Sequence, residues 1–264
     1  SSKKPTVKIY VKYNNSDISF PTEKKIIYQT KNWTLGETGS KYFILFHNLS
    51  KAWRSYSIAQ FDRRCCRVVE FITQDYAGRH LAMPFLPILL AMLLSKGEGM
   101  MFHSCGVLDG KRGYLFVGPS SSGKSTLANL CSRNQIVLND ERIIVRKCGT
   151  RFRMYGNPWH GERGKSNSKS VIIDKIFFLR VSPEGNLICP VNQTLARKKL
   201  VENCFLPLKD AQRLKYTLQF CAELAKRVPC YNLGFRPDKK IWPYLSDYFS
   251  QISNNRQGII KASK

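Results

Sequence analysis

The chain has 264 residues, and 43 lysines and arginines against 18 aspartates and glutamates give a formal net charge of +25 at pH 7. A hydrophobic fraction of 43% and an aromatic fraction of 12% exclude a disordered or fibrous protein. The charge predicts attraction to polyanions such as nucleotides, acidic peptides and nucleic acid. The basic residues are dispersed, and no DNA- or RNA-binding signature is recognisable. Nucleic acid is therefore a less favoured ligand than one that a sequence motif indicates.

Short extended runs separated by polar breaks such as NNSD and LGETGS occupy the first 80 residues. Runs of this kind, rich in β-branched and aromatic residues, are typical of strands. They lie at residues 7–13, 25–30, 41–46 and 64–72. The opening part of the chain is therefore predicted to be a β-rich segment.

The longest apolar stretch runs from Leu81 to Leu94 and contains Pro84 and Pro87. A membrane-spanning helix needs roughly 20 apolar residues, so this shorter stretch predicts a buried helix and no transmembrane segment. Nine cysteines occur without a C-x-x-C pair, which favours reduced thiols over a disulfide framework. No basic segment followed by an apolar one opens the chain, so we expect a cytoplasmic protein.

The chain after residue 96 mixes strand-like and helix-like patterns. Strands predicted at residues 100–108 and 113–118 flank the Asp109-Gly110 pair, a hairpin signal. The second of them leads into GPSSSGKST, after which residues 125–133 have helical spacing, as do residues 208–226. Further strands are predicted at residues 136–140, 143–147, 170–181, 187–191 and 228–235. This order predicts an α/β fold with a mixed sheet.

The GPSSSGKST segment matches the phosphate-loop pattern G-x-x-x-x-G-K-[ST] at Gly118, Gly123, Lys124 and Ser125. In such a loop, backbone N–H groups surround phosphate oxygens, and glycines permit the required backbone angles. Lys124 is expected to reach the β- and γ-phosphates, while the Ser125 hydroxyl completes the shell of a Mg²⁺ ion. The predicted nucleotide-binding residues are Gly118, Ser120, Ser121, Ser122, Gly123, Lys124, Ser125 and Thr126.

Two acids, Asp140 and Glu141, follow fifteen residues after Ser125, at a bend between two predicted strands. Successive side chains of an extended segment point in opposite directions, so only one acid faces the phosphates unless the chain bends. We favour Asp140 as the acid that faces the phosphates. A carboxylate that ends the apolar run IVLN costs free energy to bury unless it has a partner. The alternative is a solvated turn in which Glu141 pairs with Arg142.

Three further places carry groups able to do chemistry. His103 lies in the strand before the phosphate loop, where a buried, hydrogen-bonded histidine is the usual alternative. The segment YGNPWHGERGKS offers Glu162 as a metal ligand and Arg163 as a stabiliser of phosphoryl charge, or else forms an ordinary turn anchored by Trp159. The basic run at residues 197–199 is typical of a solvated helix or loop face.

The segments FHSCGVLDGKRGYLFVGPSSSGKSTLANL, VLNDERI and YGNPWHGE together resemble the HPr-kinase-like family, which has a P-loop core of the phosphoenolpyruvate-carboxykinase type. The similarity runs from about Leu81 to Leu245. It is nearest to bacterial kinases found beside peptide-modification and PqqD-type genes, which also end with a segment like VPCYNLGFRPD. The resemblance implies a kinase core at residues 81–264, preceded by the β-rich segment at residues 1–80.

The resemblance also implies roles for individual residues. His103 would lie near the reacting phosphate, the pair Asp140 and Glu141 would supply the base and the metal-side carboxylate, and Glu162 would be the acid of the later loop, with Arg163 beside it. The family's glycine-rich HPr-capture sequence is not recognisable, and Glu141 stands where the founding enzymes carry aspartate. HPr itself is therefore not the expected substrate.

The leading hypothesis is an ATP-dependent, Mg²⁺-requiring kinase that phosphorylates a hydroxyl, with serine or threonine of an acidic peptide or protein as acceptor. Asp140 accepts the hydroxyl proton, and Arg163 or a residue of the 197–199 run offsets developing charge. One alternative is a kinase of a sugar, nucleoside or polyol. Another is a nucleotide-regulated binding module without transfer activity. The sequence leaves the oligomeric state open and does not exclude a homo-oligomer.

Overall fold

The structure, a computed structural model, describes residues 7–15, 21–48, 54–73, 85–159, 164, 166–206 and 211–262. The chain divides into two compact units. Residues 1–96 and 206–210 form the first, and residues 97–205 and 211–264 form the second. The sequence pattern placed the boundary after residue 80.

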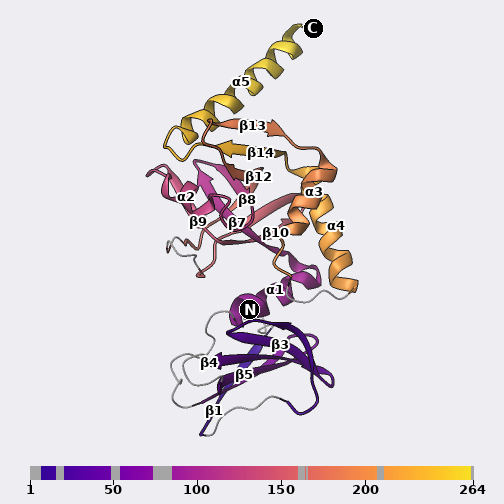
Figure 1. Cartoon of the computed structure of the whole chain (residues 1–264). Helices are drawn as coiled ribbons and strands as arrows, with labels where there is room; N and C mark the ends of the chain where they lie inside the picture. Colours follow the sequence, from indigo (N-terminus) through magenta and orange to yellow (C-terminus); the bar gives the residue numbers. More distant parts are fainter. Residues whose placement is uncertain are drawn as a thin grey trace, which may run out of the picture. The chain divides into compact units, whose positions relative to one another are not determined.

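The first unit is a six-stranded sheet in the order β1-β6-β5-β4-β3-β2, in which only the β1–β6 pair is parallel (Figure 1). Its strands are β1 (Lys8–Asn14), β2 (Lys25–Gln29), β3 (Trp33–Thr38), β4 (Lys41–Asn48), β5 (Arg54–Asp62) and β6 (Arg67–Thr73). Phe43, Leu45 and Ile58 form one of its buried hydrophobic clusters. Helix α1 (Phe85–Leu93) belongs to this unit, and its Phe85 ring meets Phe46 edge-on, with the ring centroids 6.4 Å apart.

Two strands of this unit were missed in the sequence. The LGETGS segment was treated as a break, yet most of it belongs to β3. Gly36 is not a breaker here, because a Cβ atom on it would lie 2.5 Å from the ring of Phe43 on the neighbouring strand β4. The glycine therefore makes room for a buried aromatic ring across the sheet. Strand β5 was also missed, and Ile58, Ala59 and Phe61 are its buried hydrophobic residues.

The second unit contains an eight-stranded sheet in the order β11-β10-β7-β8-β12-β14-β13, with β9 paired to β7 and β11 also paired to β12. Strand β12 runs parallel to both β8 and β14. The strands are β7 (Met100–Asp109), β8 (Arg112–Val117), β9 (Gln135–Asn139), β10 (Arg142–Cys148), β11 (Arg151–Tyr155), β12 (Ser170–Val181), β13 (Leu187–Pro190) and β14 (Cys230–Phe235). A π-helical turn at Leu94–Glu98 precedes them. The unit is a mixed α/β structure, as the sequence predicted.

Helices cover both faces of this sheet (Figure 1). Alternation along the strands sends Val117 and Phe178 into one core cluster, where α3 (Gln193–Glu202) and α4 (Ala211–Arg227) pack. Phe116 and Phe177 enter the other cluster, with α2 (Lys124–Asn129) and α5 (Ile241–Ala262). Among the described residues, no helix combines the length and apolar character needed to cross a bilayer.

Helices α3 and α5 were absent from the sequence prediction. The residues after 235 were read as a polar tail, but Ile241, Trp242, Leu245 and Phe249 recur at helical spacing and are buried in the second core cluster. The basic run at residues 197–199 lies in α3, whose Asn192 cap accepts a hydrogen bond from the backbone N–H of Leu195. Strand β11 was also missed.

Candidate active site

The GPSSSGKST segment follows the end of β8 and runs into the first turn of α2, which is the strand–loop–helix context that a phosphate loop requires. Gly123 caps α2 with φ of 98°, in the left-handed region. A Cβ atom on Gly123 would also lie 2.7 Å from Val181 and 2.8 Å from Phe235. Glycine is therefore required at this position for its backbone angle and for its lack of a side chain. Ser121 is left-handed too, with φ of 66°.

Lys124 is held inside the loop. Its side chain is 6% exposed, and its Nζ atom donates hydrogen bonds to the carbonyl oxygens of Gly118 at 2.7 Å and Pro119 at 2.6 Å. Burial lowers the pKa of Lys124 to about 8, against smaller opposing contributions from Cys105 and Glu141. The loop thus places a buried ammonium at its Gly118–Pro119 end.

Asn139 bends the chain between β9 and β10. Its Oδ1 atom accepts hydrogen bonds from the backbone N–H groups of Glu141 at 2.9 Å and Arg142 at 2.8 Å, which is an Asx turn. Because the chain turns here rather than continuing as a strand, Asp140 and Glu141 both face one cavity. Asp140 is 1% exposed. The sequence predicted that only one of the two acids would face the phosphates unless the chain bends. The chain does bend at Asn139, so both acids line the cavity.

The side-chain amide of Asn139 also joins this turn to the loop after β11. Its Nδ2 atom donates to the carbonyl oxygen of Trp159 at 2.9 Å and to Oδ1 of Asn157 at 3.3 Å. Asn157 in turn donates to the carbonyl oxygen of Arg142 at 2.6 Å. Two predicted residues of this loop, Glu162 and Arg163, lie outside the described residues.

Glu141 and Arg142 form an ion pair at 2.8 Å, as the alternative interpretation of the sequence anticipated. The pair is not fully solvated, because the side chains of Arg142 and Glu141 are 19% and 28% exposed. The Arg142 guanidinium also lies over the ring of Phe205, 5.4 Å from its centroid. Arg142 was not among the predicted site residues. Its position next to the two acids was the only feature of the sequence that could have indicated it.

His103 lies on β7, opposite Arg142 of β10 in the sheet register. Burial, then the charges of Lys124 and Arg142, lower the pKa of His103 to about 4. The imidazole is therefore neutral at pH 7. Its backbone N–H donates to the carbonyl oxygen of Asn203 at 2.8 Å, which links β7 to the end of α3.

A cavity of about 460 Å³ brings most of the predicted residues together. Its lining consists of His103, Ser120, Ser121, Gly123, Lys124, Ser125, Thr126, Asp140, Glu141 and Val181. Two predicted loop residues are not part of it: Gly118 lines a neighbouring cavity, and Ser122 is buried. Val181 was missed, since a valine that ends a strand carries no sequence signal for a site.

The oxygen donors of this cavity fit a magnesium ion that is shared with phosphate. Mg²⁺ usually takes one or two protein carboxylates together with phosphate oxygens and water, and Asp140, Glu141 and Ser125 line the same cavity. No group of three or more histidines, cysteines, aspartates and glutamates that could hold a metal ion occurs among the described residues. Ser125, Asp140 and Glu141 are the residues that would supply oxygen ligands to the metal of a bound metal–nucleotide complex.

No protein-family model matches the chain, and no curated protein matches it. One similar solved structure is the Hpr(Ser) kinase/phosphatase from Coxiella burnetii, with 10% identity, a TM-score of 0.34, and coverage of 62% of this chain and 95% of the other. A likeness at this TM-score establishes neither fold nor function. The resemblance inferred from the sequence motifs, including its PqqD-type association, therefore stays a prediction.

Proposed function

We propose that the chain is an ATP-dependent, Mg²⁺-requiring phosphotransferase that moves the γ-phosphoryl group to the hydroxyl of a serine or threonine in a peptide or protein. One observation carries this proposal: Lys124 and Ser125 of the phosphate loop share one cavity with the acids Asp140 and Glu141. Phosphoryl transfer depends on positioning and charge stabilisation, and this cavity supplies groups for both.

The loop residues Ser120 to Thr126 would hold the phosphates. Backbone N–H groups of such a loop donate to phosphate oxygens, and the ammonium of Lys124 offsets negative charge on the β- and γ-phosphates. Lys124 already lies among loop carbonyls. The Ser125 hydroxyl and Glu141 are the proposed metal-side oxygens, and a bound Mg²⁺ would neutralise charge that develops on the phosphates.

Asp140 is the proposed general base. It accepts the proton of the acceptor hydroxyl as that oxygen forms a bond to the γ-phosphorus, while the bond from the γ-phosphorus to the bridging oxygen of ADP breaks. Asp140 suits this role because it is almost fully buried beside the loop that would hold the phosphates. A carboxylate shielded from water there acts on the acceptor and not on solvent.

Arg142 and His103 are proposed to position and balance these groups. The Arg142 guanidinium holds the Glu141 carboxylate at 2.8 Å and so orients it toward the cavity. His103 is neutral at pH 7, since its pKa is about 4, and it is proposed to donate a hydrogen bond to a phosphate oxygen. Glu162 and Arg163 keep their proposed roles, as a metal ligand and a stabiliser of phosphoryl charge.

A binding module without transfer activity is the alternative from another class. Such a module would need the loop, Lys124 and a metal-side carboxylate such as Glu141, but it would not need a second carboxylate buried beside the phosphates. Burying an acid has a free-energy cost, and Asp140 is 1% exposed. This observation favours chemistry over binding alone.

A direct assay tests the proposal. The chain is incubated with γ-labelled ATP, Mg²⁺ and a pool of short peptides containing serine or threonine, and label on the peptides is measured against matched peptides with alanine at those positions. We expect label only on the hydroxyl-bearing peptides. Label on neither set, with ATP bound at the loop, would contradict a peptide acceptor and favour the binding module or a kinase of a sugar, nucleoside or polyol.

A further inference from the structure

A second cavity, of about 470 Å³, lies on the α3 face of the same sheet, next to the first. It occupies the carboxyl ends of the parallel strands β8, β12 and β14, which contribute Val117, Phe178 to Arg180, and Asn232 to Gly234. Ligands of open α/β sheets bind at this edge. The volume is within the range of about 300–1,000 Å³ typical of small-ligand sites.

Two chain segments and one backbone hydrogen bond connect the two cavities directly. Pro119 lines the second cavity and Ser120 the first; Arg180 lines the second and Val181 the first. The third link is the backbone hydrogen bond of 2.8 Å between His103 of the first cavity and Asn203 of the second. A ligand in the second cavity therefore lies beside the groups proposed to act on phosphate.

The second cavity lies at the terminal-phosphate end of the loop. The lysine of a phosphate loop reaches the β- and γ-phosphates, and the Nζ atom of Lys124 is bonded to Gly118 and Pro119, which line the second cavity. The nucleoside is attached to the α-phosphate, so it lies at the opposite end of the triphosphate from the γ-phosphate. This position suits the molecule that receives the γ-phosphoryl group.

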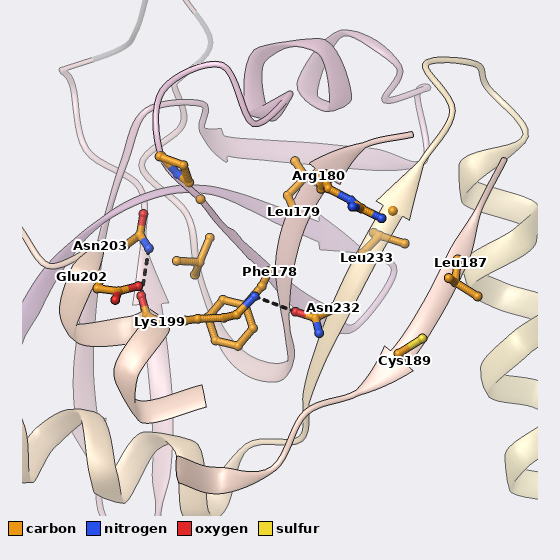
Figure 2. Close-up of a pocket in the computed structure, with 14 residues that line it drawn as sticks. Phe178, Leu179, Arg180, Leu187, Cys189, Lys199, Glu202, Asn203, Asn232 and Leu233 are labelled. Carbon is orange, nitrogen blue, oxygen red and sulfur yellow. Dashed lines mark hydrogen bonds between the residues drawn. The ribbon is translucent and has the colours of Figure 1, made fainter. Parts of the chain in front are cut away.

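Lys199 gives the cavity a fixed positive charge (Figure 2). It extends from α3 across the ring of Phe178, 5.2 Å from the centroid, and donates a hydrogen bond of 2.8 Å to Oδ1 of Asn232. An ammonium has three N–H donors, so two remain for a ligand. The carbonyl oxygen of Lys199 accepts a hydrogen bond from Asn203 at 2.8 Å, which fixes the last turn of α3.

The remaining walls combine a second cation with apolar surface. Arg180 comes from β12, and Leu187 of β13 is 57% exposed. The only acid that lines the cavity, among the described residues, is Glu202. Glu202 lies 4.0 Å from Lys198, which does not line the cavity. Two cations beside apolar walls favour an anionic group on a partly apolar ligand.

We propose that this second cavity is the acceptor subsite, and that it binds a carboxylate close to the hydroxyl that receives the phosphoryl group, through Lys199 and Arg180. This inference rests on the proposed function and names its substrate class. The carboxylate comes either from an aspartate or glutamate next to the serine, or from a free C-terminus at the serine. Both sources present the same planar pair of oxygens to the two cations.

Equilibrium binding of four short peptides tests the assignment without requiring turnover. In one pair, with blocked ends, the serine is followed by aspartate or by asparagine. In the other pair, the serine is the last residue and ends in a free carboxylate or in an amide. We expect at least one carboxylate peptide to bind about tenfold more tightly than its neutral partner, the size of one charge-assisted hydrogen bond. The pair that shows the preference identifies the source.

Two cavity variants and one control locate the effect. Lys199→Met keeps the length and apolar contact of the side chain but removes its charge, and Arg180→Gln does the same for the second cation. Arg197→Met removes one positive charge from the same helix at an exposed position outside the cavity. We expect the carboxylate preference to fall to about twofold or less in Lys199→Met, to weaken in Arg180→Gln, and to persist in Arg197→Met, with unchanged melting temperatures.

The outcomes separate this inference from the proposed function. A parent chain without carboxylate preference in either pair, or an equal loss in Lys199→Met and Arg197→Met, overturns the acceptor assignment and leaves the kinase proposal standing. Weaker binding of adenosine in Lys199→Met would identify the cavity as a nucleoside site and also overturn the assignment. A Lys199-dependent preference without any phosphoryl transfer would support the carboxylate site and contradict the kinase proposal.

Discussion

The Nζ atom of Lys124 lies 2.6 Å from the carbonyl oxygen of Pro119, inside the loop between β8 and α2. The ammonium is thus enclosed by the loop that is proposed to hold phosphate. Its burial lowers the pKa of Lys124 to about 8, within reach of ordinary experiments. The position of Lys124 inside the loop therefore predicts that ATP affinity depends on pH.

ATP affinity is expected to fall above pH 8. The phosphates attract the protonated form of Lys124, whose pKa in the free protein is about 8, so each further pH unit weakens binding by up to about tenfold until the bound-state pKa is reached. His103, with a pKa of about 4, adds no step between pH 6 and 8. Calorimetric titration with a non-hydrolysable ATP analogue and Mg²⁺ measures the profile.

The matched control for this profile is Lys124→Arg, which keeps its charge over the whole range. Its affinity is expected to stay level from pH 7 to 9.5, whatever its absolute value. A level profile in the parent chain as well would show that Lys124 does not meet the phosphates.

Thermal unfolding tests the loop in a second way. ATP with Mg²⁺ at about 100 times its Kd is expected to stabilise the parent by about 2.7 kcal/mol, seen as a higher Tm. Lys124→Ala should remove most of this increase, while Lys111→Ala, at an exposed position, should keep it. If Lys124→Ala is stabilised by ATP as strongly as the parent, the loop is not the phosphate site.

Gly123 offers a test of the loop conformation without any ligand. Gly123→Ala introduces a left-handed alanine and a clash with Val181 and Phe235, whereas Gly110→Ala introduces only the left-handed alanine, because no atom lies within 4 Å of its added Cβ. The free energy of unfolding in urea should drop by about 1–3 kcal/mol more for Gly123→Ala, the usual cost of overpacking. Equal losses would mean that the loop relaxes around the added methyl group.

The phosphate-loop motif and the two acids could be predicted from the sequence because each depends on local patterns. The convergence of Asp140 and Glu141 could not, because it results from the Asx turn of Asn139. A buried asparagine looks no different in sequence from an exposed turn residue. Lys199 was placed on a solvated face for a similar reason: its contacts with Phe178 and Asn232 join residues 21 and 33 positions apart in the chain.

The fold was predictable to a comparable extent. Strand β12 was predicted with its observed bounds, since only Asp174 and Lys175 separate its two apolar runs and both runs favour extended structure. Helix α5 was missed because polar residues separate its buried residues in the sequence. Only packing against the rest of the fold determines which face of this helix is buried. Strand β3 was missed because Gly36 was interpreted as a breaker, although it accommodates the ring of Phe43.

Asn139→Ala is expected to lower both stability and phosphoryl transfer. The substitution leaves the partly buried backbone N–H groups of Glu141 and Arg142 without their side-chain acceptor, at up to about 1–3 kcal/mol for each unsatisfied group. Asn139→Asp keeps the acceptor and should recover part of the transfer rate. Asn134→Ala, at an exposed position, should match the parent in both measurements, and a similar match for Asn139→Ala would show that the turn forms without its side chain.

The measurement that tests the account most directly is phosphoryl transfer by Asp140→Asn, followed with γ-labelled ATP and a serine peptide while ATP affinity is measured in parallel. The amide keeps the size of the side chain but cannot accept the hydroxyl proton, so transfer should fall by about 10²-fold or more, with ATP affinity within about twofold of the parent. Asp174→Asn, on an exposed side chain of β12, controls for loss of one negative charge. Equal transfer rates in Asp140→Asn and the parent, at equal ATP affinity, would contradict the assignment of Asp140 as the base.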